Sequence, residues 1–131
     1  MKTSILIFML VLINTVFAQA PEGDLRAKII VEEIENNIKI TGTAENLSDI
    51  MQSMTYKLSV IKKNINTNNQ SNNAQEGLFS LEPNEIKNLS TTQVNIGEND
   101  QIIVMLLFYN EDKEIVAKDR IVLGEAEKKK K

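Results

Sequence analysis

The sequence predicts an all-β protein, a two-sheet sandwich of about seven antiparallel strands. Apolar residues recur with a period of two over most of the chain, which is the spacing of a strand with one buried face. Turn-forming Gly, Pro, Asn and Asp residues interrupt these runs at short intervals, and no segment carries the 3.6-residue period of an amphipathic helix. A small barrel stays open as the alternative, because periodicity does not distinguish it from a sandwich.

The first half of the chain predicts a hairpin followed by a half-buried strand. Residues 27–32 begin a strand, Asn36 and Asn37 form a turn pair suited to left-handed backbone angles, and residues 38–42 return as the second strand. Residues 46–49 are predicted as a loop. The next strand, 55–62, directs alternate side chains to its two faces, with Tyr56, Leu58 and Val60 on one and Lys57, Ser59 and Ile61 on the other.

The second half predicts four more strand segments. A short strand at 78–81 is stopped by Pro83 and Asn84, and 85–96 resumes β structure with uneven apolar spacing that predicts a bulge near residues 90 to 92. After a turn at 97–100, residues 101–109 are apolar on both faces, which predicts a strand in the middle of a sheet. A turn at 110–113 leads to 114–118, and 119–123 either continues or partners that segment.

The tract 64–77 carries six Asn and two Gln in fourteen residues. Its composition is typical of a solvated connection, and we interpret it as a long hairpin connection between the strands around it. The same composition also occurs in the stacked amide ladders of cross-β fibres, so direct contact with a partner is the alternative.

The N-terminus has the pattern of a secretory signal. One Lys precedes an apolar run of about nine residues, and small residues follow, which predicts a signal peptide at 1–18. We expect an N-terminal extension at 19–26, one domain at 27–123 and a charged, Lys-rich tail at 124–131. From residue 19 onward the chain has 14 basic against 18 acidic residues, an acidic balance that argues against nucleic acid as a partner. The pattern predicts an exported protein without stable membrane insertion.

The composition excludes most catalytic chemistry. The chain has no His, Cys or Trp, so it offers no imidazole base, no thiolate and no soft zinc ligand. We therefore expect a protein that is not an enzyme and needs no cofactor or metal. Four acidic residues in turns offer oxygen atoms suited to calcium, but no loop among them has the ligand spacing of a calcium site: Glu98, Asp100, Glu111 and Asp112.

The order of motifs resembles the CsgH family of periplasmic curli chaperones. The resemblance covers residues 54 to about 123, through the segments MTYKLSVIKK, AQEGLFSLEPNE, NLSTTQVNI and ENDQIIVMLLFYNEDKEIVAKDRI. The matching positions are Tyr56, Leu58, Ser59, Val60, Lys62, Gln75, Gly77, Phe79, Leu81, Glu85, Leu89, Ser90, Val94, Asn95 and Asp100. The chain lacks the Cys-x-Cys pair of the related CsgC chaperones, and it has Glu82-Pro83-Asn84 where a Gly-containing turn is expected.

The resemblance implies an immunoglobulin-like sandwich that keeps a secreted amyloid subunit from polymerising before export. On this hypothesis a monomer in the periplasm binds its unfolded client weakly, through an edge strand at 56–62 with outward lysines that attract an acidic client. The candidate partner-binding residues are Lys57, Ser59, Lys62, Lys63, Asn68, Gln70 and Gln75. The alternative function is a non-catalytic immunoglobulin-like accessory module that docks onto a secretion or adhesion apparatus.

Overall fold

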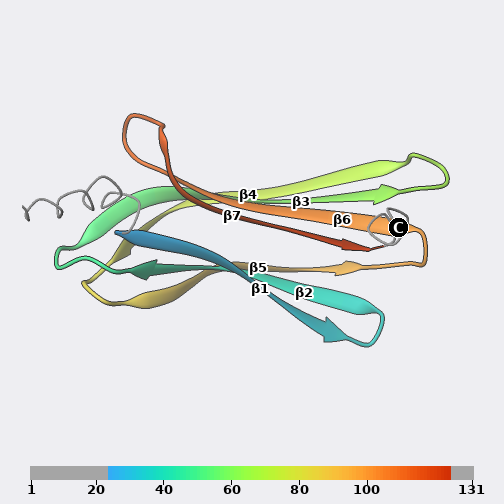
Figure 1. Ribbon diagram of the computed structural model, residues 1–131, viewed down its shortest axis with the longest axis horizontal. Helices are drawn as coiled ribbons and strands as arrows, with labels where there is room; N and C mark the ends of the chain where they lie inside the picture. The colour runs from blue at the N-terminus through green and yellow to red at the C-terminus, as the bar shows by residue number, and fades with distance from the viewer. Residues whose placement is uncertain (1–23, 125–131) are drawn as a thin grey trace, which may run out of the picture.

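The computed structural model describes residues 24–124, which form seven strands in two sheets (Figure 1). One sheet has the order β1-β2-β5, and the other has the order β4-β3-β6-β7, with every pairing antiparallel. The strands are β1 (Leu25–Ile34), β2 (Asn37–Asn46), β3 (Gln52–Asn64), β4 (Gln70–Leu81), β5 (Ile86–Asn95), β6 (Asp100–Tyr109) and β7 (Ile115–Gly124). The sandwich is therefore confirmed over the barrel, and the predicted signal peptide lies outside the described residues.

The two layers pack through the alternate side chains that face inward. β6 lies between β3 and β7, as predicted for the segment that is apolar on both faces, and its four even-numbered side chains from Ile102 to Phe108 are fully buried. The opposite side chains of β6 are only half-buried. Aromatic rings pack side by side within the β4-β3-β6-β7 sheet, since the Phe79 ring of β4 lies 4.9 Å from that of Phe108 on β6 and 6.3 Å from that of Tyr56 on β3, each pair tilted as such rings prefer.

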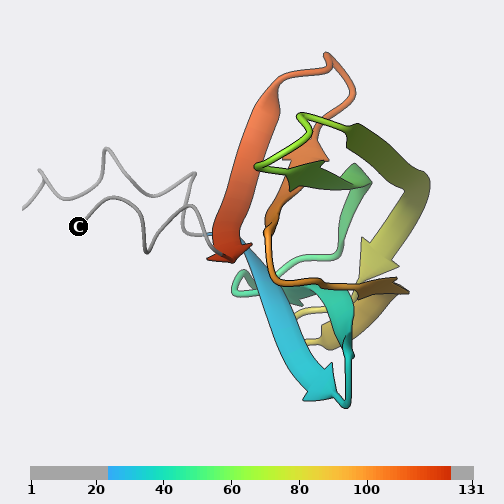
Figure 2. The ribbon, with the colours of Figure 1, turned by 90° about the vertical axis from the view of Figure 1, so that its right-hand side faces the viewer.

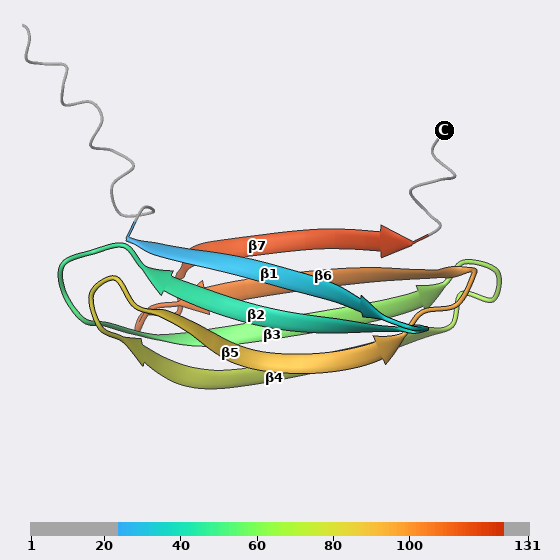
Figure 3. The same ribbon diagram turned by 90° about the horizontal axis from the view of Figure 1, so that it is seen from below.

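The sheet order places β4 beside β3, and this decides which edges are free. In a constant-type immunoglobulin domain the fourth strand extends the sheet of the first, second and fifth strands. Here β4 instead forms a long hairpin with β3, and the sandwich presents β1 and β7 along one side and β5 and β4 along the other (Figures 2 and 3). Among residues 24–124 no helix is long and apolar enough to cross a membrane.

The interpretation of the amide tract as a long connection is wrong. Only residues 65–69 connect the two strands, and β4 begins at Gln70, so most of the tract is strand paired with β3. The connection is also held by its own side chains, because the Asn64 Oδ1 accepts hydrogen bonds from the backbone N–H groups of Asn66 and Thr67. Asn68 completes the turn with a φ of 66°.

Smaller differences concern turns and strand ends. The first hairpin turns at Glu35 and Asn36, with Glu35 in the left-handed region, and Asn37 already belongs to β2. The expected bulge lies at Leu89, one residue before the predicted stretch, where the register with β2 shifts. β1 begins at Leu25 and β7 ends at Gly124, and the last two predicted segments form one strand, β7.

Candidate partner-binding edge and face

The strand predicted to bind a partner through its edge is not an edge strand. β3 pairs with β4 along Gln52–Lys63 and with β6 along Thr55–Asn64, so its backbone groups are used on both sides. The prediction that residues 56–62 offer a free edge is therefore wrong. The predicted alternation of that segment is confirmed, because Leu58 and Val60 are buried, but a half-buried strand has the same pattern in the middle of a sheet as at its edge.

Of the free edges, those of β1 and β7 shield one another. The Ile29 N–H of β1 points away from β2 and donates a 2.9 Å hydrogen bond to the Asp119 Oδ2 of β7. β7 also carries three charged residues in a row, 118 to 120, and charges on an edge oppose pairing with a further strand. Both features are devices by which natural sheets avoid edge-to-edge association.

β5 and the end of β4 are protected in a different way. The bulge at Leu89 interrupts β5, and the carbonyl of this residue accepts a 3.4 Å hydrogen bond from the Tyr56 hydroxyl. Lys87 on β5 reaches β4, where its Nζ donates a 3.0 Å hydrogen bond to the Ser80 carbonyl. A bulge and an edge lysine both oppose pairing with a further strand.

The rest of β4 has none of these devices. From Gln70 to Leu78 there is no Pro, no Lys and no bulge, and Glu76 is its single charged residue. The Ser80 carbonyl points away from β3 toward Lys87, and backbone direction alternates along a strand, so the even-numbered residues from 70 to 78 direct their N–H and C=O groups outward. We call this stretch the β4 edge. It is open to pairing with an extended chain.

The outer face of the β4-β3-β6-β7 sheet is basic. Strand register places Lys57 and Lys63 of β3 and Lys118 and Arg120 of β7 on this face, which we call the basic face. The strands contribute one acidic residue to it, Glu76, although residues 24–124 as a whole hold 10 basic and 15 acidic residues. Between the cations runs a half-buried apolar stripe formed by Ile61, Ile103, Met105, Leu107, Tyr109 and Val122.

The structure brings together four of the seven predicted partner-binding residues. Lys57, Ser59 and Lys63 lie on the outer face of β3, and Gln70 lies beside Lys63 at the start of the β4 edge. Asn68 is exposed at the hairpin turn. Gln75 belongs to the β4 edge strand, but it is paired with Leu58 and so directs its side chain to the inner side of the sheet.

Lys62 does not point outward as expected. It lies on the Leu58 and Val60 side of β3, at the end of the sandwich, where its Nζ is 3.6 Å from Asp100 Oδ2. The Gly97 N–H donates a 2.8 Å hydrogen bond to the same oxygen, and Asn64 Nδ2 donates to the other. The Gly97 bond is the main cause that lowers the pKa of Asp100, and it outweighs the opposing effect of burial.

Lys62 and Asp100 therefore have a structural role in this cluster. It joins the end of β3 to the turn before β6, and the Ile65 N–H adds a backbone hydrogen bond to the Asn99 carbonyl. The four acidic residues considered as calcium ligands lie at opposite ends of β6. Among residues 24–124 no group of three acidic side chains is placed to hold a metal ion.

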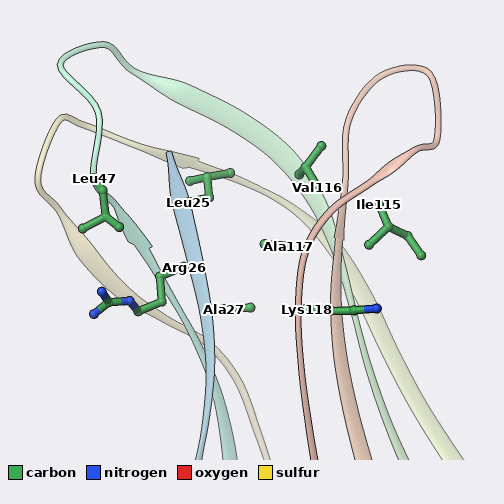
Figure 4. A pocket seen from close by; sticks show the side chains of 8 residues that line it. All are labelled: Leu25, Arg26, Ala27, Leu47, Ile115, Val116, Ala117 and Lys118. Atoms are coloured by element: carbon green, nitrogen blue, oxygen red, sulfur yellow. The ribbon is translucent and has the colours of Figure 1, made fainter. Parts of the chain in front are cut away.

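A hollow of about 570 Å³ lies on the opposite side of the sandwich, between the first residues of β1 and β7 (Figure 4). Its lining is mostly apolar, through Leu25, Ala27, Leu47, Val116 and Ala117. The side chains of Arg26 and Lys118, also at its rim, point away from each other on opposite sides (Figure 4). No pair of polar groups converges on the hollow, so we place the candidate site at the β4 edge and the basic face.

Sequence reasoning missed Lys118 and Arg120 and the even-numbered residues of the β4 edge. The two cations do alternate with Asp119, which places them on one face of a strand. Their position beside Lys57 depends on the sheet order, because β6 must lie between β3 and β7. The β4 edge was missed because its amide-rich sequence was assigned to a connection.

Comparison with solved structures supports the fold. The chain is similar to CsgH of R. palustris, with a TM-score of 0.54 and 12% identity over 76% of this chain and 91% of that one. It is similar to the E. coli curli protein CsgC, with a TM-score of 0.53 and 14% identity over 73% of this chain and 96% of that one. No family model matches the sequence, and no curated protein matches it.

The same fold also occurs as part of a larger enzyme. A glycosyl hydrolase family 2 member from Bacteroides cellulosilyticus matches with a TM-score of 0.54 and 11% identity over 77% of this chain, which corresponds to 15% of that protein. At such identities the comparisons establish a CsgH- and CsgC-like β-sandwich and leave function to be argued from the surface.

Proposed function

We propose that this protein is an exported, non-catalytic chaperone that delays polymerisation of a secreted, curli-type amyloid subunit by weak and transient binding. The observation that carries the proposal is the open β4 edge beside the basic face. An unfolded client strand that pairs with β4 occupies the backbone groups that a second client would need. The likeness in fold to two curli proteins supports this choice of client class.

The basic face supplies attraction at a distance. A strand added to β4 runs about 5 Å from it and about 10 Å from β3, a range over which the lysines of β3 act on a charged client. Lys57 and Lys63 therefore favour an acidic client and raise the rate of encounter more than the strength of the complex. Fast, weak association suits a client that must leave for export.

Other features agree with a binding protein outside the cytoplasm. The first eighteen residues have the pattern of a signal peptide, which directs the chain to the periplasm in a bacterium with an outer membrane. The chain has no His or Cys to build a common catalytic site. The proposed binding through the surface requires no cofactor.

The test is a fibre-formation assay with a purified curli-type subunit and an amyloid dye. Protein purified after export, added at a small fraction of the subunit concentration, should lengthen the lag before fibres appear. Ala74→Pro removes an outward N–H from the β4 edge and should lose most of the effect. Gln93→Pro makes the same change on β5 and is the matched control, since it is also an exposed strand residue on a free edge.

A second variant tests the basic face. Lys57→Glu combined with Lys63→Glu should weaken the delay for an acidic subunit, and added salt should weaken the wild-type delay in the same way. Circular dichroism and urea unfolding check that each variant is folded. An unchanged lag at equal concentrations of wild-type protein and subunit would overturn the proposal and favour an accessory module that docks onto a secretion or adhesion apparatus.

A further inference from the structure

We infer that two copies of this protein pair through their β4 edges, so that two four-stranded sheets become one continuous sheet across a two-fold axis near Ala74. The pairing itself does not depend on the proposed function. Only its consequence rests on that function: a paired β4 edge is not available to the client. The dimer then acts as a store of inactive protein that dissociates on dilution. It replaces the expected monomer by an equilibrium between one copy and two.

The sequence of the β4 edge is complementary to itself in an antiparallel pair. With the axis at Ala74, the outward-directed residues pair as Ala74 with its own copy, Asn72 with Glu76, and Gln70 with Leu78. The single charged residue of the edge, Glu76, thus faces a neutral amide that can donate a hydrogen bond to its carboxylate. Like charges do not meet, and a small Ala lies at the centre of the pair.

Features of the other three edges oppose such self-pairing. Self-pairing of β7 about Asp119 would bring two carboxylates together, and this carboxylate already accepts the Ile29 N–H of β1. β5 carries the bulge at Leu89, which breaks the register that a second copy would need. The β4 edge is therefore the place where a second copy fits.

The dimer is expected to be weak. One pair of strands buries less surface than the roughly 1,200 Å² at the lower limit of stable interfaces. Its amide and Ala side chains add little apolar contact beyond the exposed Leu78. Because the contact is small, the dimer should dissociate on dilution: the fraction of paired copies decreases as the protein concentration is lowered.

Sedimentation equilibrium over a range of concentrations tests the pairing without any client. The wild-type protein, purified after export, should rise in mass from one chain toward two as concentration increases. Ala74→Pro should sediment as a single copy throughout, because it removes the N–H at the centre of the pair. Gln93→Pro, the matched change on β5, should dimerise like the wild type. A wild-type mass that stays at one chain, or an Ala74→Pro variant that dimerises normally, would overturn the inference.

Cross-linking gives the register. The chain has no Cys, so a single introduced thiol reports its own contacts. Residues that exchange hydrogen bonds in an antiparallel pair have Cα atoms about 5.5 Å apart, within the range of a disulfide. Ala74→Cys should therefore oxidise to a covalent dimer roughly tenfold faster than Gln93→Cys, because pairing raises the local thiol concentration. Equal rates for the two variants would contradict an axis near Ala74.

The covalent dimer separates failure of the inference from failure of the proposed function. Oxidised Ala74→Cys should no longer delay fibre formation, and reduction should restore the delay. If the dimer forms as described but the oxidised protein delays fibres as well as the reduced protein does, the β4 edge is not the client site. If the wild type delays fibres but never pairs, the self-pairing inference is wrong and the client proposal stands.

Discussion

Asn46 provides the sharpest test of how the sandwich is held together. It is fully buried at the end of β2, and its Nδ2 donates to three backbone carbonyls, those of Ile50, Leu81 and Glu82, at 2.8 to 3.2 Å. Its Oδ1 accepts hydrogen bonds from the backbone N–H and the hydroxyl of Ser48. One side chain thus joins the loop after β2 to the end of β4.

Asn46→Ala removes these partners and leaves a small cavity. Each buried polar group that loses its partner costs about 1 to 3 kcal/mol. After the substitution, water can replace Asn46 at the partly buried partners but not at the buried Leu81 carbonyl. We therefore expect the free energy of unfolding to fall by about 3 to 5 kcal/mol, a large part of the roughly 5 to 15 kcal/mol typical of a domain. At a urea m-value near 2 kcal/mol/M the midpoint falls by about 2 M.

The measurement is urea unfolding followed by circular dichroism, because the chain has no Trp. Asn95→Ala is the control: its amide makes one 3.5 Å contact with Asn37 on the surface, and its loss should cost less than about 0.5 kcal/mol. Asn46→Asp keeps the volume and the acceptor for Ser48 but loses the donor, so it should be as damaging as Asn46→Ala. A loss below about 1 kcal/mol for Asn46→Ala would refute the reasoning.

Two further predictions concern Asp100 and Gly77. The pKa of Asp100 in the folded protein is lowered from its ordinary value of 3.8, so its contribution to stability is present above that pH and is lost as the pH falls through the folded pKa. The wild type should therefore lose more stability than Asp100→Asn below about pH 4. Parallel pH profiles of the urea midpoints of the two proteins would contradict this. A Cβ on Gly77 would meet the Tyr56 ring at 3.0 Å, so Gly77→Val should cost about 1 to 3 kcal/mol by overpacking. In a Tyr56→Ala background the same change should cost much less, and equal costs in both backgrounds, measured in a double-mutant cycle, would show that the ring is not the obstacle.

Much of the fold could be predicted because strand periodicity depends on local sequence. The alternation from Tyr56 to Ile61 and the apolar run of β6 each gave the correct strand, and Asn84 adopts the left-handed conformation that its place after Pro83 suggested. These features follow from burial of one face or from a single backbone angle. They need no knowledge of which strands are neighbours.

The amide tract was misassigned because its own residues give no strand signal. Asn is depleted in strands and favoured in turns, so local preference points to a connection. Pairing with the thirteen-residue β3 overrides that preference, since each residue of β4 gains a partner on a strand that is already fixed by the core. Edge and central strands are likewise distinguished by their neighbours and not by their own alternation, and for this reason the central position of β3 could not be predicted from its sequence.

The composition of β4 acquires a physical meaning once it is known to be an edge. A long, open edge built from Val and Ile would pair strongly and without control. Asn, Gln, Ser and Ala pair through their backbones while adding little apolar contact, so each added strand is held weakly. The lysines on the neighbouring strand then raise the association rate of acidic chains without strengthening the backbone pairing. An open edge whose side chains add little apolar contact, beside a basic face, therefore favours brief pairing over permanent association.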